Sequence, residues 1–175
     1  MHQEFDLVVI GTGTAGSTVA SRCRAAGWNV AIVDSRPFGG TCALRGCDPK
    51  RVLVGAADLR DWSQRMTSRK ISSEPIRIDW PALMQFKKAF TDPVPEDRET
   101  SFSNAGIRAF HGRAQFLDKG TLQIGTDVVK AQKIVIASGA MPAPLGISGE
   151  EYLIHSDQFL ELRDLPERIL FVGGG

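Results

Sequence analysis

The first 34 residues alternate between strand and helix patterns around a run of glycines. Residues 5–10, FDLVVI, form an apolar, β-branched run that predicts a strand buried on both faces. The sequence GTGTAG follows and opens a segment, 15–26, with apolar residues at helical spacing. Residues 29–34, NVAIVD, predict a second buried strand that ends in an acid. This order indicates an α/β fold with a parallel sheet, because a strand, a crossover helix and a second strand form a βαβ unit.

The glycine spacing and the acid predict a dinucleotide site. Gly11 makes the turn, Gly13 lets the backbone approach a pyrophosphate, and Gly16 brings the helix against the strand. The amides at the start of the helix then face the phosphates. Asp34 lies 23 positions beyond Gly11, close to the ~20 of this fingerprint, and its carboxylate can accept hydrogen bonds from both hydroxyls of an adenosine ribose. A carboxylate there repels a 2′-phosphate, so we expect a cofactor such as FAD or NAD.

Two of the three cysteines stand close together in GGTCALRGCDPK, residues 39–50. In a regular helix, Cα atoms five positions apart are about 8.6 Å from each other, whereas a disulfide needs about 4.4 to 6.8 Å. Cys42 and Cys47 can therefore bond only if the chain is distorted between them, and Gly46 tolerates such distortion. We expect thiolates of low pKa, stabilised by the start of a helix and by Lys50.

This pair could be a static crosslink, a metal site or a redox catalyst. So short a loop constrains the unfolded chain little, which disfavours a static crosslink. A structural zinc needs four closely spaced ligands, and the other candidates are Cys23 and three scattered histidines. We therefore expect no metal site, and we interpret Cys23 as a small buried apolar residue. The redox interpretation is favoured.

The overall charge and hydropathy exclude other classes. A net charge of +1, from 21 basic and 20 acidic residues, provides no basic surface of the kind that binds nucleic acid. No apolar run approaches the ~20 residues that span a bilayer, and the N-terminal residues lack a basic region followed by an apolar core. We expect a cytoplasmic protein with a small-molecule substrate and with neither a nucleic-acid nor a membrane partner.

Together, GTGTAG, the acid-ended strand and GGTCALRGCDPK resemble the N-terminus of the flavin-dependent pyridine nucleotide-disulfide oxidoreductases, the family of glutathione reductase, dihydrolipoamide dehydrogenase and mercuric reductase. The resemblance implies FAD on a Rossmann-like domain and an NAD(P)H hydride that passes through the flavin to the cysteine pair. It implies that Cys42 and Cys47 form a redox-active disulfide, in which Cys42 attacks the substrate and Cys47 contacts the isoalloxazine as a thiolate. Lys50 would stabilise the reduced, anionic flavin.

The resemblance also implies a set of cofactor contacts. These are Gly11, Gly13, Thr14, Ala15, Gly16, Asp34, Ser35, Gly40, Thr41, Cys42, Lys50, Ala114, Ser138 and Gly139. Ala114 ends HGRA, 111–114, which matches a stretch whose backbone contacts the adenine in the family. We interpret His111, in the same stretch, as a structural or surface residue rather than a base.

The residues around the cysteines bear on the substrate. Arg45 departs from the family wording and places a cation where substrate and flavin approach. Lys50 directly follows Pro49, as in glutathione reductase, which favours a glutathione-reductase-like activity. The alternatives are dihydrolipoamide dehydrogenase or mercuric reductase activity and, from another class, a non-catalytic flavin module that senses redox state.

The middle of the chain predicts three helices, over 52–65, 80–90 and 96–105. After Gly106, alternating apolar and polar residues with turns at 119–120 and 125–126 predict a small inserted antiparallel meander. In the first helix we expect four residues to face inward: Leu53, Ala56, Ala57 and Leu59. Four aromatic residues are expected to pack in the core or at a dimer interface: Trp62, Trp80, Phe86 and Phe90.

The last residues, RILFVGGG, predict a buried strand and the first glycines of a second nucleotide turn. We therefore expect a FAD-binding domain over 1–165, with the cysteine pair and the meander, and over 166–175 the beginning of a truncated NAD(P)H-binding domain. The resemblance implies that the longer enzyme is a homodimer whose later domains supply the nicotinamide site and a His–Glu pair that serves the other subunit's attacking cysteine. We expect the chain alone to bind FAD poorly and to be inactive.

Overall fold

The structure is a computed structural model that describes residues 2–67, 69–71, 74 and 76–173. Its strands are β1 (His2–Ile10), β2 (Val30–Asp34), β3 (Arg108–His111), β4 (Ala114–Phe116), β5 (Thr121–Ile124) and β6 (Asp127–Ile136). Its helices are α1 (Thr14–Ala25), α2 (Gly40–Arg45), α3 (Cys47–Thr67), α4 (Trp80–Thr91), α5 (Val94–Asn104) and α6 (Ser156–Phe159), with a 3-10 turn, η1 (Glu150–Tyr152).

One six-stranded sheet, in the order β3-β2-β1-β6-β5-β4, forms the centre of the fold. β1 pairs in parallel with β2 and with β6, and β2 pairs in parallel with β3. At the other edge, β5 pairs antiparallel with β6, and β4 pairs antiparallel with β5. This arrangement confirms the predicted α/β, Rossmann-like class with an antiparallel meander beside the parallel strands.

The strand at 108–111 departs from the prediction. Its alternating pattern placed it in the meander, but β3 pairs in parallel with β2, with His111 opposite Asp34. A short alternating strand is compatible with neighbours of either direction, so its sequence does not select one. Here the long helical connection through α3, α4 and α5 returns the chain to the start of a strand, which produces parallel pairing.

The register brings the carboxyl ends of three parallel strands to one edge of the sheet. Ile10 at the end of β1 stands opposite Val33 on β2 and Ile136 on β6. In the sheet, β2 lies next to β1 on one side and β6 lies next to β1 on the other side. Such a change in the direction of the strand order opens a crevice at the carboxyl ends of the strands, where open α/β sheets bind ligands. Gly11 and Asp34 lie at this edge.

Apolar side chains form one buried cluster on each face of the sheet. Along β1, Val8 belongs to one cluster, whereas Leu7 and Val9 belong to the other, as the alternation of a strand requires. α1 and α5 add Ala20 and Phe102 to the second cluster. Leu7, Val8 and Val9 are each at most 2% exposed, which confirms the prediction that β1 is buried on both faces.

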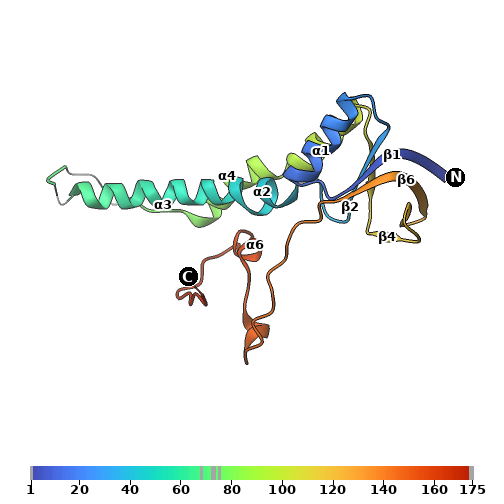
Figure 1. Cartoon of the computed structure of the whole chain (residues 1–175). Helices are drawn as coiled ribbons and strands as arrows, with labels where there is room; N and C mark the ends of the chain where they lie inside the picture. Colours follow the sequence, from blue (N-terminus) through green and yellow to red (C-terminus); the bar gives the residue numbers. More distant parts are fainter. Residues whose placement is uncertain (1, 68, 72–73, 75, 174–175) are drawn as a thin grey trace.

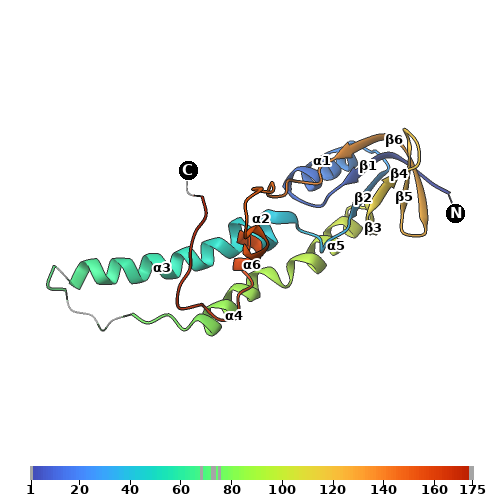
Figure 2. The same cartoon turned by 90° about the horizontal axis from the view of Figure 1, so that it is seen from below.

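The helices α3 and α4 form an arm that projects away from the sheet (Figures 1 and 2). Both predicted helices are confirmed, but the predicted inward face of α3 is wrong. Ala57 and Leu59 are exposed, Leu53 and Ala56 are half-buried, and the buried residue of α3 is Pro49. The reason is that α3 extends beyond the sheet and packs mainly along α4, so that one neighbouring helix covers little of its surface.

Most of the aromatic side chains of the arm lie outside the core of the chain, and their packing at a dimer interface stays a prediction. Trp62 is 60% exposed, and Phe86 and Phe90 are 58% and 52% exposed. Phe86 and Phe90 contact each other edge to face, with ring centroids 5.1 Å apart. Trp80 alone among the four predicted residues is half-buried, because it contacts Phe159 of α6.

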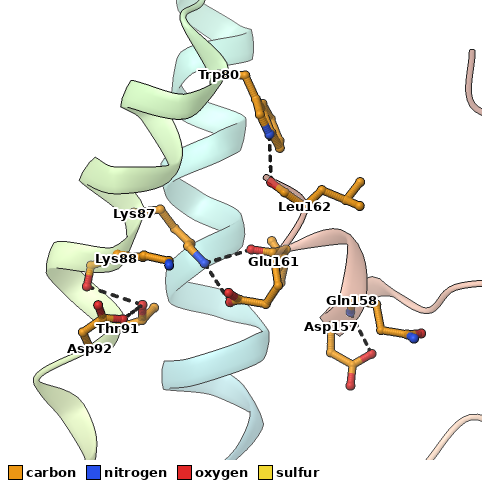
Figure 3. A network of polar contacts seen from close by, with 10 residues as sticks. Trp80, Lys87, Lys88, Thr91, Asp92, Asp157, Gln158, Glu161 and Leu162 are labelled. Carbon is orange, nitrogen blue, oxygen red and sulfur yellow. Dashed lines mark hydrogen bonds and ion pairs between the residues drawn. The ribbon is translucent and has the colours of Figure 1, made fainter. Parts of the chain in front are cut away.

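A buried lysine fastens the segment around α6 to the arm, as Figure 3 shows. Lys87 on α4 is fully buried, and its Nζ donates to the Leu160 carbonyl and to Glu161 Oε1, each at 2.8 Å. About two helical turns away on α4, the Trp80 Nε1–H donates to the Leu162 carbonyl at 2.9 Å. These contacts hold residues 159–162 against α4.

Residues 168–173 contradict the predicted strand. They have no regular secondary structure, and Leu170 and Phe171 are 88% and 80% exposed. A buried strand needs strand neighbours, and none of the described strands pairs with this segment. Gly174 and Gly175, in the predicted glycine turn, lie outside the described residues, and the division at 165/166 stays a prediction. In the described part of the chain, every helix is too short or too polar to cross a membrane.

Candidate functional site

A cavity of about 690 Å³ opens at the carboxyl ends of the parallel strands. Its size falls within the roughly 300 to 1,000 Å³ of small-molecule sites. Of the predicted cofactor contacts, only Gly16 and Lys50 do not line it. Those that do are Gly11, Gly13, Thr14, Ala15, Asp34, Ser35, Gly40, Thr41, Cys42, Ala114, Ser138 and Gly139. Five separate stretches of the sequence therefore converge on one cavity.

The glycine turn forms one wall of this cavity. Gly11 has a φ of +109°, and a Cβ there would lie 2.2 Å from the Ala137 carbonyl oxygen. A Cβ at Gly16 would lie 2.0 Å from the Gly11 carbonyl oxygen, so Gly16 packs α1 against the turn, as predicted. Gly13 is the N-cap of α1; no side chain caps the helix, and its first turn holds no acid. The first amides of α1 are therefore available to an anion in the cavity.

The Asp34 carboxylate is held by three hydrogen bonds within the protein. Oδ2 accepts from the N–H and the hydroxyl of Thr12 at 2.8 and 2.7 Å, and Oδ1 accepts from the Arg36 N–H at 3.0 Å. Thr12 is 1% exposed, and its hydroxyl also accepts from the Gly39 N–H at 3.2 Å. Sequence reasoning missed Thr12. The available signal was a hydroxyl residue inside the turn, because a buried hydroxyl requires partners.

The two cysteines stand on two helices divided by Gly46. Cys42 lies in α2, and Cys47 is the first residue of α3. A Cβ at Gly46 would lie 2.9 Å from the Thr41 carbonyl oxygen, so the helix can break there only with glycine or with a shift of the backbone. The chain is thus distorted between the cysteines, which is the condition that a bond between them requires.

Cys42 and Cys47 are free thiols whose side chains are hydrogen-bonded to each other. This hydrogen bond raises the pKa of Cys42, and desolvation and the negative charges of Cys47 and Asp48 raise it further. The predicted low pKa is therefore wrong for Cys42, because the neighbouring sulfur, desolvation and Asp48 together favour its protonated form.

The two cysteines differ in their relation to the cavity. Cys42 lines it, whereas Cys47 and Lys50 are exposed and are not among its lining residues. Lys50 lies three residues after Cys47 in the first turn of α3, so their side chains share one face of that helix. Within the residues that the structure describes, no group of three or more His, Cys, Asp and Glu side chains is placed to hold a metal ion.

Three guanidinium groups line the cavity, from Arg36, Arg45 and Arg113. Arg45 meets the expectation of a cation beside the first cysteine. Sequence reasoning missed the other two, although Arg36 follows Asp34 by two positions and Arg113 belongs to HGRA. Asp34 is the acidic residue of the lining. Because the cations outnumber it, the cavity suits an anionic ligand.

His111, next to the lining residue Gly112, has contacts within the protein. Its ring stacks on Phe38 with centroids 4.3 Å apart, and its Nε2 lies 3.1 Å from Glu99 Oε1. Both contacts agree with the interpretation of His111 as a structural or surface residue.

Comparison with known proteins shows which family the chain resembles. Residues 5–175 match the family described as pyridine nucleotide-disulphide oxidoreductase. The chain is 33% identical over 172 residues to a glutathione reductase of Burkholderia cepacia, in a match that covers 98% of this chain and 38% of that protein. It is 31% identical over 185 residues to the chloroplastic/mitochondrial glutathione reductase of Pisum sativum, covering 98% of this chain and 33% of the relative.

A relative with a different activity matches at a similar level. The chain is 29% identical over 182 residues to a dihydrolipoyl dehydrogenase of Chlamydia muridarum, in a match that covers 100% of this chain and 39% of that protein. The chain thus spans 33% to 39% of the length of these curated relatives.

Proposed function

Because the chain belongs to the pyridine nucleotide-disulphide oxidoreductase family, we propose that the whole protein is an FAD-dependent disulfide reductase that takes its electrons from NAD(P)H. Its redox centre is the pair Cys42 and Cys47. One observation carries this proposal. Two hydrogen-bonded thiols, one of which lines a cavity, stand opposite a glycine turn and an acid at the end of a strand.

The residues of the cavity fit FAD. Its diphosphate matches the uncapped first turn of α1 and the turn at Gly11 and Gly13, where side chains are absent. The guanidinium groups of the lining offset its negative charge. Asp34 keeps acceptor capacity on Oδ1 for the adenosine ribose, since that oxygen accepts one hydrogen bond within the protein. When bound, FAD supplies the transfer of an electron pair between a nicotinamide and the dithiol.

The cysteine pair completes the electron balance. Oxidation of the two thiols to a disulfide releases two electrons and two protons, and reduction takes up the same number. We assign Cys47 as the thiolate on the side of the flavin, as the resemblance of GGTCALRGCDPK to the family implies. Lys50, one helical turn along α3, adds a positive charge on the same helix face.

Cys42 is the thiol that attacks the substrate. With its pKa raised, it needs a base to remove its proton before it becomes nucleophilic. Attack on a disulfide forms a mixed disulfide and releases the first thiol, and attack by Cys47 on Cys42 then releases the second. We propose a glutathione-like disulfide as substrate, supported by the two glutathione reductases among the relatives and by Lys50 directly after Pro49.

A reductive titration of the whole protein tests this function. Under anaerobic conditions, the oxidised protein should take up two equivalents of NADPH or NADH per flavin, one for the flavin and one for the disulfide. The variant Cys42→Ser should take up one equivalent and should no longer reduce glutathione disulfide. Steady-state rates with glutathione disulfide, lipoamide and mercuric ion then identify the substrate class.

The result also separates the rival function. A non-catalytic, redox-sensing flavin module would bind FAD but would take up no electrons from either nicotinamide. A protein that purifies without flavin and does not bind added FAD would contradict the proposal altogether.

A further inference from the structure

Thr12 connects three parts of the candidate site and uses all of its polar atoms in doing so. Its hydroxyl donates to Asp34 Oδ2 at 2.7 Å and accepts from the Gly39 N–H at 3.2 Å. Its own N–H donates to the same Oδ2 at 2.8 Å, and its carbonyl accepts from the Ser17 hydroxyl at 2.8 Å. With 1% of its surface exposed, Thr12 does not line the cavity. Any effect it has on a ligand is exerted through these partners.

The first partner, Asp34, loses most of its acceptor capacity to the protein. An ionised carboxylate offers about four lone-pair positions. Thr12 occupies both positions on Oδ2, and the Arg36 N–H occupies one on Oδ1. One position remains, on Oδ1. The carboxylate can therefore accept one hydrogen bond from a ribose instead of the two that the sequence suggests.

The second partner, Gly39, directly precedes α2, the helix that carries Cys42. Its φ of +133° is one that residues other than glycine rarely adopt, and its N–H is buried with the Thr12 hydroxyl as acceptor. Without that hydroxyl, the N–H would lose its partner, which is costly in a buried place. The hydroxyl that orients the acid thus also holds the start of the cysteine helix.

We propose that Thr12 is a positioning residue, which turns the Asp34 carboxylate so that Oδ1 alone reads a single ribose hydroxyl of the bound nucleotide and which ties that acid to the start of α2. This inference rests on the proposed function, because it concerns the adenosine end of the same cofactor site. It adds a specific expectation, namely that the two ribose hydroxyls contribute unequally to binding.

Nucleotide analogues test the unequal contribution. The probes are ADP, 2′-deoxy-ADP and 3′-deoxy-ADP, titrated into the flavin-free whole protein in a calorimeter. One of the two deoxy analogues should bind about tenfold more weakly than ADP, as expected for one lost hydrogen bond to a charged group, and the other within about twofold. Equal losses for both analogues, or no loss for either, would overturn the inference.

Two variants of Thr12 assign this discrimination to its hydroxyl. Thr12→Val keeps the shape but lacks the hydroxyl, so the two analogues should bind with equal affinity. Thr12→Ser keeps the hydroxyl and should restore the difference of about tenfold. If the serine variant behaves as the valine variant, or if the valine variant still discriminates, the hydroxyl does not position Asp34.

Amide hydrogen exchange gives a readout that needs neither ligand nor variant. The Gly39 N–H lies outside any helix or strand, yet it should exchange slowly because the Thr12 hydroxyl accepts from it. Exchange at the rate of an unstructured glycine would overturn the link to α2. If the whole protein binds neither FAD nor ADP, the proposed function fails together with this inference. If it binds FAD but the analogue pattern is absent, the inference alone fails.

Discussion

The cavity and the helical arm are held together in different ways. At the cavity, backbone meets backbone: Gly13 and Gly40 approach so closely that a Cβ on Gly40 would lie 2.3 Å from the Gly13 Cα. Along the arm, side chains are loosely packed, and Trp62 is 60% exposed. The segment around α6 is held on the arm by a few polar contacts, among them the ion pair between Lys87 and Glu161. Steric fit therefore defines the cavity, whereas a few side-chain contacts hold the segment around α6 on the arm.

The largest contrast is expected from the same substitution made in the two regions. Gly40→Ala places a Cβ against the Gly13 backbone at a φ of +70°. The conformation costs about 1 to 2 kcal/mol and the overlap about 1 to 3 kcal/mol, so the free energy of unfolding should fall by about 3 kcal/mol. Equilibrium unfolding in urea measures this change in the free energy of unfolding.

Gly55→Ala is the matched control on the arm. A Cβ there would meet nothing within 4 Å, and the residue lies inside α3. Alanine should therefore raise the free energy of unfolding by roughly 0.5 to 1 kcal/mol through helix propensity. Equal effects of the two substitutions would remove the distinction between the regions.

The second contrast breaks the fastening of the segment around α6 to the arm. Glu161→Ala leaves the fully buried ammonium of Lys87 with the Leu160 carbonyl but without a counter-charge. We expect a loss of about 2 kcal/mol in the free energy of unfolding, below the range for fully buried pairs because the Glu161 side chain is 55% exposed.

Lys87→Met tests whether the unpaired positive charge of Lys87 causes the loss of stability in Glu161→Ala. Methionine fills a similar volume without a charge, and Glu161 can then turn to water, so the loss should be smaller, about 1 kcal/mol. The double variant Lys87→Met, Glu161→Ala should be no less stable than Glu161→Ala alone. A double variant that loses the sum of both effects would show that the ion pair does not couple them.

The smallest expected effect concerns the coupling of the two thiols. In Cys47→Ala, Cys42 loses the partner that raises its pKa, so its pKa should fall and thiolate should form at lower pH. The pH profile of Cys42 alkylation by iodoacetamide, followed by peptide mass spectrometry, should move to lower pH. Asp48→Asn removes a smaller contribution to the raised pKa of Cys42, so the profile should move in the same direction but by less. An unchanged profile in Cys47→Ala would show that the thiols are independent.

The difference between the regions also explains what the sequence could predict. The roles of Gly11, Gly16 and Gly46 were accessible because each glycine is required by a backbone atom a few residues away or by a motif of fixed spacing. Ser138 was accessible only through the family resemblance, and the structure brings it to the same cavity as Asp34 because the strands before them end at one edge of the sheet.

Features that depend on distant partners were not accessible. The hydroxyl of Thr12 inside the turn was a signal for a polar contact, but its role could not be assigned, because its partner Asp34 lies 22 positions away. Helical spacing predicted α3, but Leu59 faces solvent because the spacing does not tell what covers a helix. The raised pKa of Cys42 depends on how close Cys47 lies, which spacing alone leaves open.

The central claim is that the cysteine pair and the nucleotide cavity serve one flavin, with the thiolate of Cys47 against it. The most direct test is the absorption spectrum of the whole protein after anaerobic reduction by two electrons. The account predicts a broad long-wavelength band from thiolate-to-flavin charge transfer. In Cys42→Ser this band should be present before any reduction and should be lost when the flavin is reduced, and in Cys47→Ser it should be absent in both states. A two-electron-reduced protein that lacks this band, or a Cys47→Ser variant that retains it, would contradict the account.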